Sequence, residues 1–200
     1  MDPQRKDASL ISTMRRINHL LNIVLAAAWL GFCLPVAAYA QDSARLTELL
    51  ERLATPDLPN WDLVEREIYQ RWSISGSATA DLLLERGQRA LDVEDYAAAY
   101  DHLTALTDHA PEFAEGWNAR ATLFFQLGQY GPSIADIQHV LALNPHHFGA
   151  LTGLAIMLEE MDQPEAALEA TRAARAIHPN RPDLEEAEQR LERMLEGTAL

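Results

Sequence analysis

The sequence predicts an all-α fold, an α-solenoid in which helix–turn–helix units stack side by side. Three prolines, Pro111, Pro145 and Pro179, are spaced 34 residues apart, and each closes a segment rich in Leu, Ala and His. Within these segments apolar residues recur at spacings of three and four, the pattern of amphipathic helices. A repeat of this length indicates a stacked array, because one helical pair cannot bury its apolar face alone.

Aligning the chain on these prolines gives three units, 80–113, 114–147 and 148–181. The aligned columns hold similar residues: Leu83, Trp117 and Leu151; Gly87, Ala121 and Ala155; Tyr96, Tyr130 and Pro164; Ala99, Ser133 and Ala167. The small residues of the second column would let paired helices approach closely. Each unit is therefore predicted to be two packed helices.

The middle unit carries the most typical residues of this pattern: Trp117, Ala121, Phe124, Gly128-Gln129-Tyr130 and Leu143-Asn144-Pro145. In these residues, and in its 34-residue period, the chain resembles the tetratricopeptide repeat (TPR) family. The third unit departs from it with Asp162-Gln163-Pro164, where Gly-x-Tyr is usual. The resemblance implies a right-handed superhelix of stacked hairpins, in which the first helix of each unit lines an inner groove that binds peptides or partner helices.

The repeats are flanked by two further helical regions. Residues 41–79 are predicted to hold helices over 43–54 and 61–72, an extra hairpin expected to cover the first repeat, and then a linker at Ser73–Ser77. Residues 182–200 begin near a proline and carry a narrow apolar stripe with glutamates on the other side. This helix is predicted to cap the array, since the ends of such arrays must face water.

The N-terminal residues 1–40 have the organisation of a secretory signal peptide. Arg15 and Arg16 precede a mostly apolar stretch, Leu20–Ala40, which ends in the small-residue motif Ala38-Tyr39-Ala40. A charged start, an apolar core and an A-x-A end are the signature of a cleaved signal. We therefore expect cleavage after Ala40 and a periplasmic protein, with Met14 as an alternative start.

The alternative is that this stretch stays attached as a membrane anchor. Leu20–Ala40 is just long enough to span a bilayer, although Asn22 and Pro35 interrupt it. Membrane contact is expected only through such an uncleaved anchor. Both interpretations place the rest of the chain outside the cytoplasmic membrane.

The charge of the chain restricts its partners. Sixteen basic residues stand against 30 acidic ones, for a net charge of −14. Removal of residues 1–40 would leave 28 acidic and 12 basic residues, and all 12 of the basic residues are arginine. Nucleic acid is not an expected partner, because phosphate binding needs clustered basic residues. A single cysteine, Cys33, excludes a disulfide framework and a cysteine-rich zinc module.

No pattern in the sequence supports catalysis. The chain lacks a G-x-S-x-G elbow, a glycine-rich phosphate loop and an H-E-x-x-H motif. Asp136, His139 and the pair His146-His147 raise the idea of a metal site, but we expect His139 to face solvent and the pair to lie in a loop. Acidic clusters near Asp92 and Glu159 lack a calcium-loop pattern. We expect no enzyme activity, no cofactor and no metal.

The predicted function instead concerns the inner groove. The candidate partner-binding residues lie on the first helix of each unit: Leu84, Gln88, Leu91, Glu115, Asn118, Thr122, Phe125, Gln126, Thr152, Ile156 and Glu159. The apolar members would anchor side chains, and Asn118 and Gln126 would hydrogen-bond a peptide backbone. The positions that would carry the cations of a carboxylate clamp are Leu84, Gln88, Ala119, Gly149 and Gly153, so a clamp is not expected.

An acidic rim that includes Glu115 and Glu159 would favour a neutral or basic protein or peptide. Charge reversal at these two residues is expected to weaken capture of the partner without lowering helicity. The sequence thus predicts a non-enzymatic interaction protein, an exported adaptor or assembly factor. The alternative is a structural, self-associating envelope protein. The mass of the protein in solution would distinguish the two, because a monomer favours the adaptor. An enzyme with a convergent metal site is the least favoured class, which metal analysis would test.

Overall fold

The computed structural model describes residues 43–198, and all of their regular secondary structure is α-helical, as predicted. The chain divides into two units, residues 1–47 and 48–200. The predicted signal peptide lies outside the described residues. Within 43–198, no helix is both long enough and apolar enough to cross a membrane.

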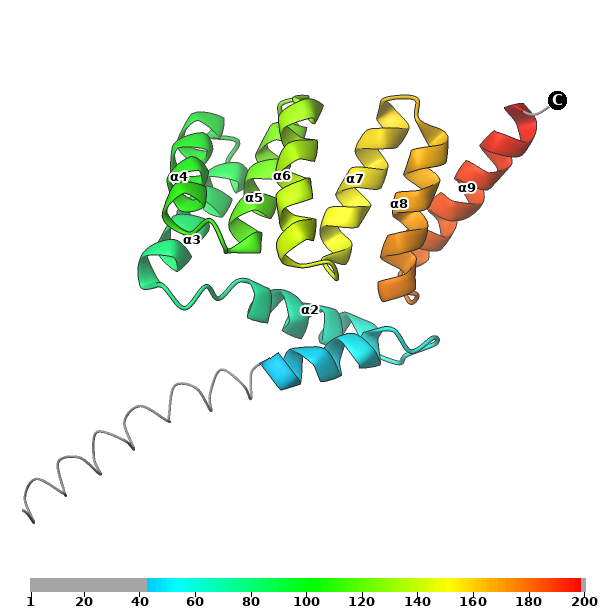
Figure 1. Cartoon of the computed structure of the whole chain (residues 1–200), viewed down its shortest axis with the longest axis horizontal. Helices are drawn as coiled ribbons and strands as arrows, with labels where there is room; N and C mark the ends of the chain where they lie inside the picture. Colours follow the sequence, from blue (N-terminus) through cyan, green and yellow to red (C-terminus); the bar gives the residue numbers. More distant parts are fainter. Residues whose placement is uncertain (1–42, 199–200) are drawn as a thin grey trace, which may run out of the picture. The chain divides into compact units, whose positions relative to one another are not determined.

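Three helical hairpins follow one another along the second unit (Figure 1). They are α3 (Ala78–Asp92) with α4 (Tyr96–His109), α5 (Ala114–Gln126) with α6 (Tyr130–Leu143), and α7 (Phe148–Glu160) with α8 (Pro164–Ile177). The ends of α3, α5 and α7 are each 34 residues apart. The proline period of the sequence therefore corresponds to the period of the hairpins.

The turn inside each hairpin places its second residue in the left-handed region of backbone space. Glu94, Gly128 and Asp162 have φ values of 58°, 69° and 57°. This conformation ends the first helix, and glycine adopts it without a steric cost. The second helix then begins at once. In the first hairpin the Asp95 side chain caps α4 by accepting a hydrogen bond from the Ala98 amide over 3.1 Å.

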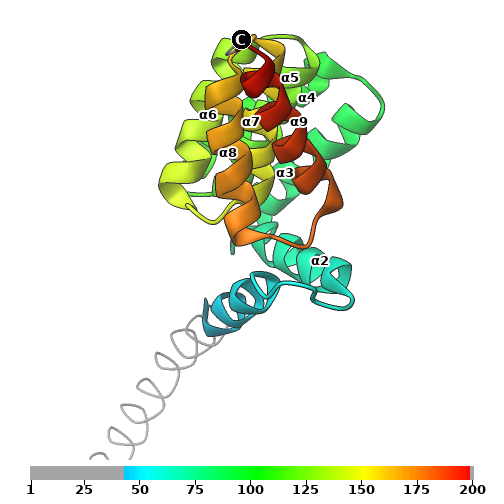
Figure 2. The ribbon, with the colours of Figure 1, turned by 90° about the vertical axis from the view of Figure 1, so that its right-hand side faces the viewer.

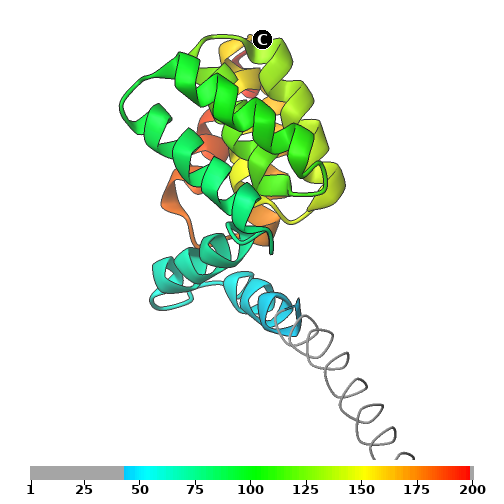
Figure 3. The same ribbon diagram turned by 90° about the vertical axis from the view of Figure 1, so that its left-hand side faces the viewer.

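The first helices of the hairpins form an inner layer and the second helices an outer one. Helix α5 contacts both α3 and α7, whereas the outer helices contact one another less extensively. The green and yellow-green helices of the first two hairpins lie side by side in Figure 3. Gly87 allows the close approach of α3 to α4, because a Cβ there would overlap the Leu103 side chain. Ala121 and Ala155 are buried at the equivalent positions. We call the solvent-facing side of α3, α5 and α7 the inner face.

Helix α9 (Pro182–Thr198) lies along α8 (Figure 2). Leu184 and Leu191, two members of the predicted apolar stripe, are buried at 2% and 1% exposure. Arg175 donates to Glu188 over 2.6 Å, and Arg190 of α9 reaches back to Glu159 of α7 over 2.7 Å. The helix therefore covers the end of the array with an apolar seam bordered by ion pairs.

The N-terminal hairpin does not cover the first repeat, and that prediction was wrong. Helices are present over 43–53 and in α2 (Trp61–Trp72), close to the predicted bounds. Helix α2, however, packs against the loops that precede α7 and α9. Trp72 stacks on His147 with ring centroids 4.5 Å apart, and Trp61 meets His178 edge-on at 5.1 Å. The aromatic residues of α2 find their partners in His147 and His178 of those loops and in Phe148 at the start of α7.

Two further contacts hold this hairpin. The Asn180 side chain accepts from the Leu58 amide over 2.9 Å and donates to the Leu53 carbonyl over 2.8 Å. In the predicted linker, the backbone and side chain of Ser75 both donate to Asp81, over 2.8 and 2.6 Å. The connection between α2 and α3 is therefore held by hydrogen bonds to α3 itself.

Candidate functional site

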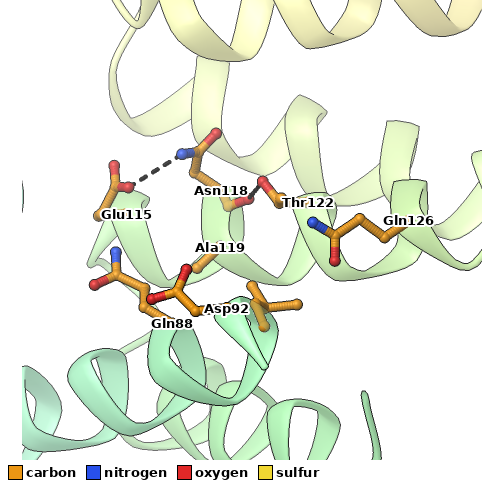
Figure 4. Close-up of a pocket in the computed structure, with 8 residues that line it drawn as sticks. Gln88, Asp92, Glu115, Asn118, Ala119, Thr122 and Gln126 are labelled. Carbon is orange, nitrogen blue, oxygen red and sulfur yellow. Dashed lines mark hydrogen bonds between the residues drawn. The ribbon is translucent and has the colours of Figure 1, made fainter. Parts of the chain in front are cut away.

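A hollow of about 500 Å³ opens on the inner face between α3 and α5 (Figure 4). We call it the larger hollow. Its walls are Gln88, Leu91 and Asp92 from α3 and Glu115, Asn118, Ala119, Thr122 and Gln126 from α5. Within each helix these residues recur at three- and four-residue spacings, so each set lies on one helical face.

A second, smaller hollow of about 70 Å³ lies between α5, α6 and α7. Its lining is largely apolar and comprises Asn118, Ala121, Thr122, Phe125, Ser133, Ile137, Gly149, Ala150, Gly153 and Met157. Asn118 and Thr122 line both hollows and form the ridge between them. Gly149 and Gly153 lie one turn apart on α7, and the missing side chain of Gly153 leaves space open in this hollow.

Glu115 is a buried carboxylate with two neutral hydrogen-bond donors. Its Oε1 accepts from Asn118 Nδ2 and its Oε2 from His147 Nε2, each over 3.1 Å, and Glu115 is only 7% exposed. His147 Nδ1 accepts from the Ala150 amide over 3.1 Å, which assigns the ring proton to Nε2. A neutral imidazole therefore satisfies both hydrogen bonds of His147, the one to Glu115 and the one from Ala150. Among the described residues, the Glu115 carboxylate has no paired cation.

The larger hollow is acidic. Asp92 is exposed, and within the described residues it makes no ion pair or side-chain hydrogen bond. Among residues 43–198, no lysine or arginine lines either hollow. Two carboxylates without cationic partners attract a positively charged group and accelerate its approach.

The N-terminal hairpin packs against the inner face at the start of α7. A Cβ at Gly149 would collide with the Tyr69 hydroxyl, so the absence of a side chain at Gly149 lets Tyr69 pack closely against the start of α7. Burial raises the pKa of Tyr69, which keeps its phenol protonated. Trp72 stacks on the ring of His147, the residue that precedes α7. The hairpin therefore holds the histidine that orients Glu115.

The structure brings together most of the residues predicted for the groove. The larger hollow contains six of them: Gln88, Leu91, Glu115, Asn118, Thr122 and Gln126. Phe125 lines the smaller hollow. Ile156 is 43% exposed on α7, whereas the Thr152 hydroxyl donates to the Phe148 carbonyl over 2.8 Å and so binds its own helix. These last two residues line neither hollow.

Three of the expectations for this surface need correction. Leu84 is 3% exposed and belongs to the core between α3 and α4, so it offers no anchor to a partner. Glu115 is buried instead of lying on an exposed rim. Glu159 is paired with Arg190, whose hydrogen bond lowers the pKa of the carboxyl. Charge reversal at Glu115 would break the bond to His147, so it would disturb the fold as well as the surface.

Other residues of the site were missed or misplaced by sequence reasoning. Asp92, which was not among the residues predicted for the groove, lines the larger hollow. His147 lies in the predicted loop, where it caps α7, but it is completely buried. No local signal distinguishes His147 from the exposed His146, because its burial comes from α2. His139 is exposed, as expected, and stacks on Trp117 at 4.3 Å.

The part of the chain that the structure describes contains no group of three or more His, Cys, Asp or Glu side chains arranged to hold a metal ion. Asp136, considered with His139 for such a site, is instead 4% exposed and paired with Arg120. Two hydrogen bonds of 2.7 and 2.8 Å join them. The carboxylate of Asp136 therefore has a structural partner.

Stacked hairpins with an open inner face define the class of helical-repeat scaffolds. No family model matches the chain. A TPR repeat-containing protein of Rhizobium etli is 37% identical over 145 residues, which cover 71% of this chain and 70% of that protein. The chain belongs to the TPR repeat-containing proteins.

Solved structures share this fold. The first TPR of Spaghetti (RPAP3) bound to the HSP90 peptide SRMEEVD has a TM-score of 0.57 at 21% identity, over 60% of this chain and 94% of that one. The type III secretion chaperone SycD of Yersinia enterocolitica, in complex with a peptide of the translocator YopD, has a TM-score of 0.52 at 18% identity, over 60% and 92%. At these identities the likeness concerns the fold.

Proposed function

We propose that this protein is a non-enzymatic, exported adaptor or assembly factor that binds a segment of a partner protein on its inner face. The observation that carries the proposal is the larger hollow, which opens on the inner helices and continues over the ridge of Asn118 and Thr122 into the smaller one. A concave surface with a few polar groups beside apolar ones suits recognition of an extended peptide.

The charges of the hollows favour a neutral or basic segment. Asp92 and Glu115 contribute carboxylates, and among the residues described no lysine or arginine offsets them there. A partner's terminal carboxylate would meet repulsion on this surface. That two similar folds were solved with peptides, of HSP90 and of YopD, supports peptide binding as the mode of recognition.

The export part of the proposal rests on residues 1–40. Their positive start, apolar core and A-x-A end support cleavage after Ala40 and a periplasmic location. Mass spectrometry of the protein from its native cells tests this. A mature N-terminus at Gln41 in the periplasmic fraction is expected, and an intact chain in the cytoplasmic fraction would contradict export.

A photo-crosslinking amino acid at Gln88 tests the binding surface. Gln88 is exposed in the larger hollow, and Ala135, exposed on the outer helix α6, is the matched control position. In native cells we expect a discrete adduct from Gln88 and none of that mass from Ala135. The same adduct from both positions, or from neither, would contradict binding at the inner face.

Self-association has one specific observation in its favour. Val93, Leu127 and Met161 occupy equivalent hairpin turns and are 74%, 40% and 40% exposed. Recurring exposed apolar residues can form a protein contact. Sedimentation of the mature protein, compared with a variant in which all three are serine, tests this. A wild-type oligomer that the variant loses would favour self-association, and a monomer in both would exclude this contact.

A further inference from the structure

We propose that the inner face selects a segment in which a lysine or arginine lies close to a short apolar side chain, the cation entering the larger hollow and the apolar side chain the smaller one. This inference rests on the proposed function and specifies the partner's chemistry. It follows from the different linings of the two hollows and from the ridge that joins them.

The larger hollow is suited to a cation because of how Glu115 is satisfied. Its two donors, Asn118 and His147, are both neutral, so within the described chain no cation is paired with the carboxylate at a site that is 7% exposed. A buried charge without a counterion is costly, and a partner's cation would relieve that cost. Asp92 lies on the opposite wall, on α3 (Figure 4). A cation that enters the hollow would therefore meet carboxylates on both walls.

The smaller hollow admits only a short side chain. Its volume is about 70 Å³, against about 500 Å³ for the larger hollow. Phe125, Ile137 and Met157 supply an apolar lining. A Cβ built on Gly153 would meet only Ile137 Cδ1, at 3.8 Å, so the space above Gly153 is free. Alanine or valine fits this space, whereas an aromatic side chain does not.

The ridge supplies the contact to the partner's backbone. Asn118 Nδ2 is committed to Glu115, which orients the amide and turns Oδ1 away from the carboxylate (Figure 4). Among the described residues Oδ1 has no hydrogen-bond donor, so it is available to a backbone N–H of the segment. In an extended segment, side chains on the same face are two residues apart, which suits two adjoining hollows.

The probe for the first test is a biotinylated, positional-scanning library of nonapeptides, presented to the purified mature protein. The expected result is enrichment of Lys or Arg at one position and of Ala or Val at a nearby one. Enrichment of acidic or aromatic residues at these positions, or no enrichment over a scrambled background, would overturn the proposal. The best single peptide is then resynthesised for affinity measurements.

Variants of the smaller hollow give the second test. Gly153→Leu fills it, and Gly131→Leu is the matched control, because Gly131 is exposed on α6 with nothing near its Cβ position. We expect Gly153→Leu to weaken binding about tenfold or more and Gly131→Leu to leave it unchanged. Gly153→Ala is the control for misfolding of the leucine variant. It should retain or raise the stability of the protein and should still weaken binding. Equal affinities of all three variants would overturn the assignment.

The cation is tested with a pair of peptides. Asp92→Asn should weaken binding of the Lys peptide about threefold and leave unchanged a peptide with norleucine in place of Lys. The same loss with both peptides would overturn the role of charge. If the library shows no such preference while Gln88 still crosslinks to a partner, this inference fails and the proposed function stands. If neither peptide nor partner is captured, both fail.

Discussion

Trp72 stacks on His147, with ring centroids 4.5 Å apart and ring planes inclined by 21°. This contact joins the N-terminal hairpin to the loop before α7. His147 in turn caps α7 through the Ala150 amide and holds Glu115 of α5. One buried side chain therefore connects three parts of the protein, and it stands directly behind the larger hollow.

We expect His147→Ala to destabilise the protein by about 2–4 kcal/mol. The substitution removes a helix cap, worth about 1 kcal/mol, and leaves a buried carboxylate short of a donor, which costs about 1–3 kcal/mol. Urea unfolding followed by circular dichroism measures the change. His146→Ala is the control, because His146 is exposed and its change should stay within about 0.5 kcal/mol. Similar losses in the two variants would contradict this role.

The pair Arg120–Asp136 should behave as a buried unit. Their side chains are 16% and 6% exposed, and Arg120 also donates to Thr107 over 2.8 Å. The hydrogen bond with Asp136 raises the pKa of Arg120. Asp136→Ala should cost about 3 kcal/mol because it strands a partly buried guanidinium. In the double variant Arg120→Ala/Asp136→Ala, the loss should be smaller than the sum of the single losses; additive losses would exclude coupling.

The left-handed turns predict opposite effects of two substitutions. Glu94→Gly should stabilise the protein by about 0.5–1 kcal/mol, because glycine adopts a positive φ without the steric cost that a side chain incurs. Gly128→Ala should destabilise it by about 1 kcal/mol for the same reason. Both changes are measured by thermal unfolding. A loss of stability in Glu94→Gly would show that its side chain makes a contact that outweighs the backbone term.

Acid should loosen α9 before the repeats. The hydrogen bond from Arg175 lowers the pKa of Glu188, below a value near 4.3 in the unfolded chain. The stabilisation is therefore present above that value and is lost as the pH falls through the folded-state pKa. The protection of the α9 amides from hydrogen exchange, corrected for the intrinsic rate at each pH, should fall between about pH 5 and 3. In Glu188→Gln this pH dependence should be flatter, and an unchanged profile would rule out Glu188 as its origin.

The array was predictable because its signals are local. Each hairpin carries its own closing proline, its own three- and four-residue spacing of apolar residues and its own small residue, Gly87, Ala121 or Ala155. The inner-face positions of Gln88, Asn118 and Gln126 follow from the same helical period. Leu84 shows the limit of this reasoning, because an apolar residue on that face serves the core as readily as a ligand.

The 34-residue hairpins, their turns and the helices that carry the inner face are thus determined by the sequence alone, since each depends on residues within one or two helical turns. Tertiary structure alone decided where the N-terminal hairpin packs, which histidine is buried and that the inner face divides into two hollows. These features depend on contacts such as Trp72 with His147 and Tyr69 with Gly149. Their members are distant in the chain, so no local pattern records which surfaces meet.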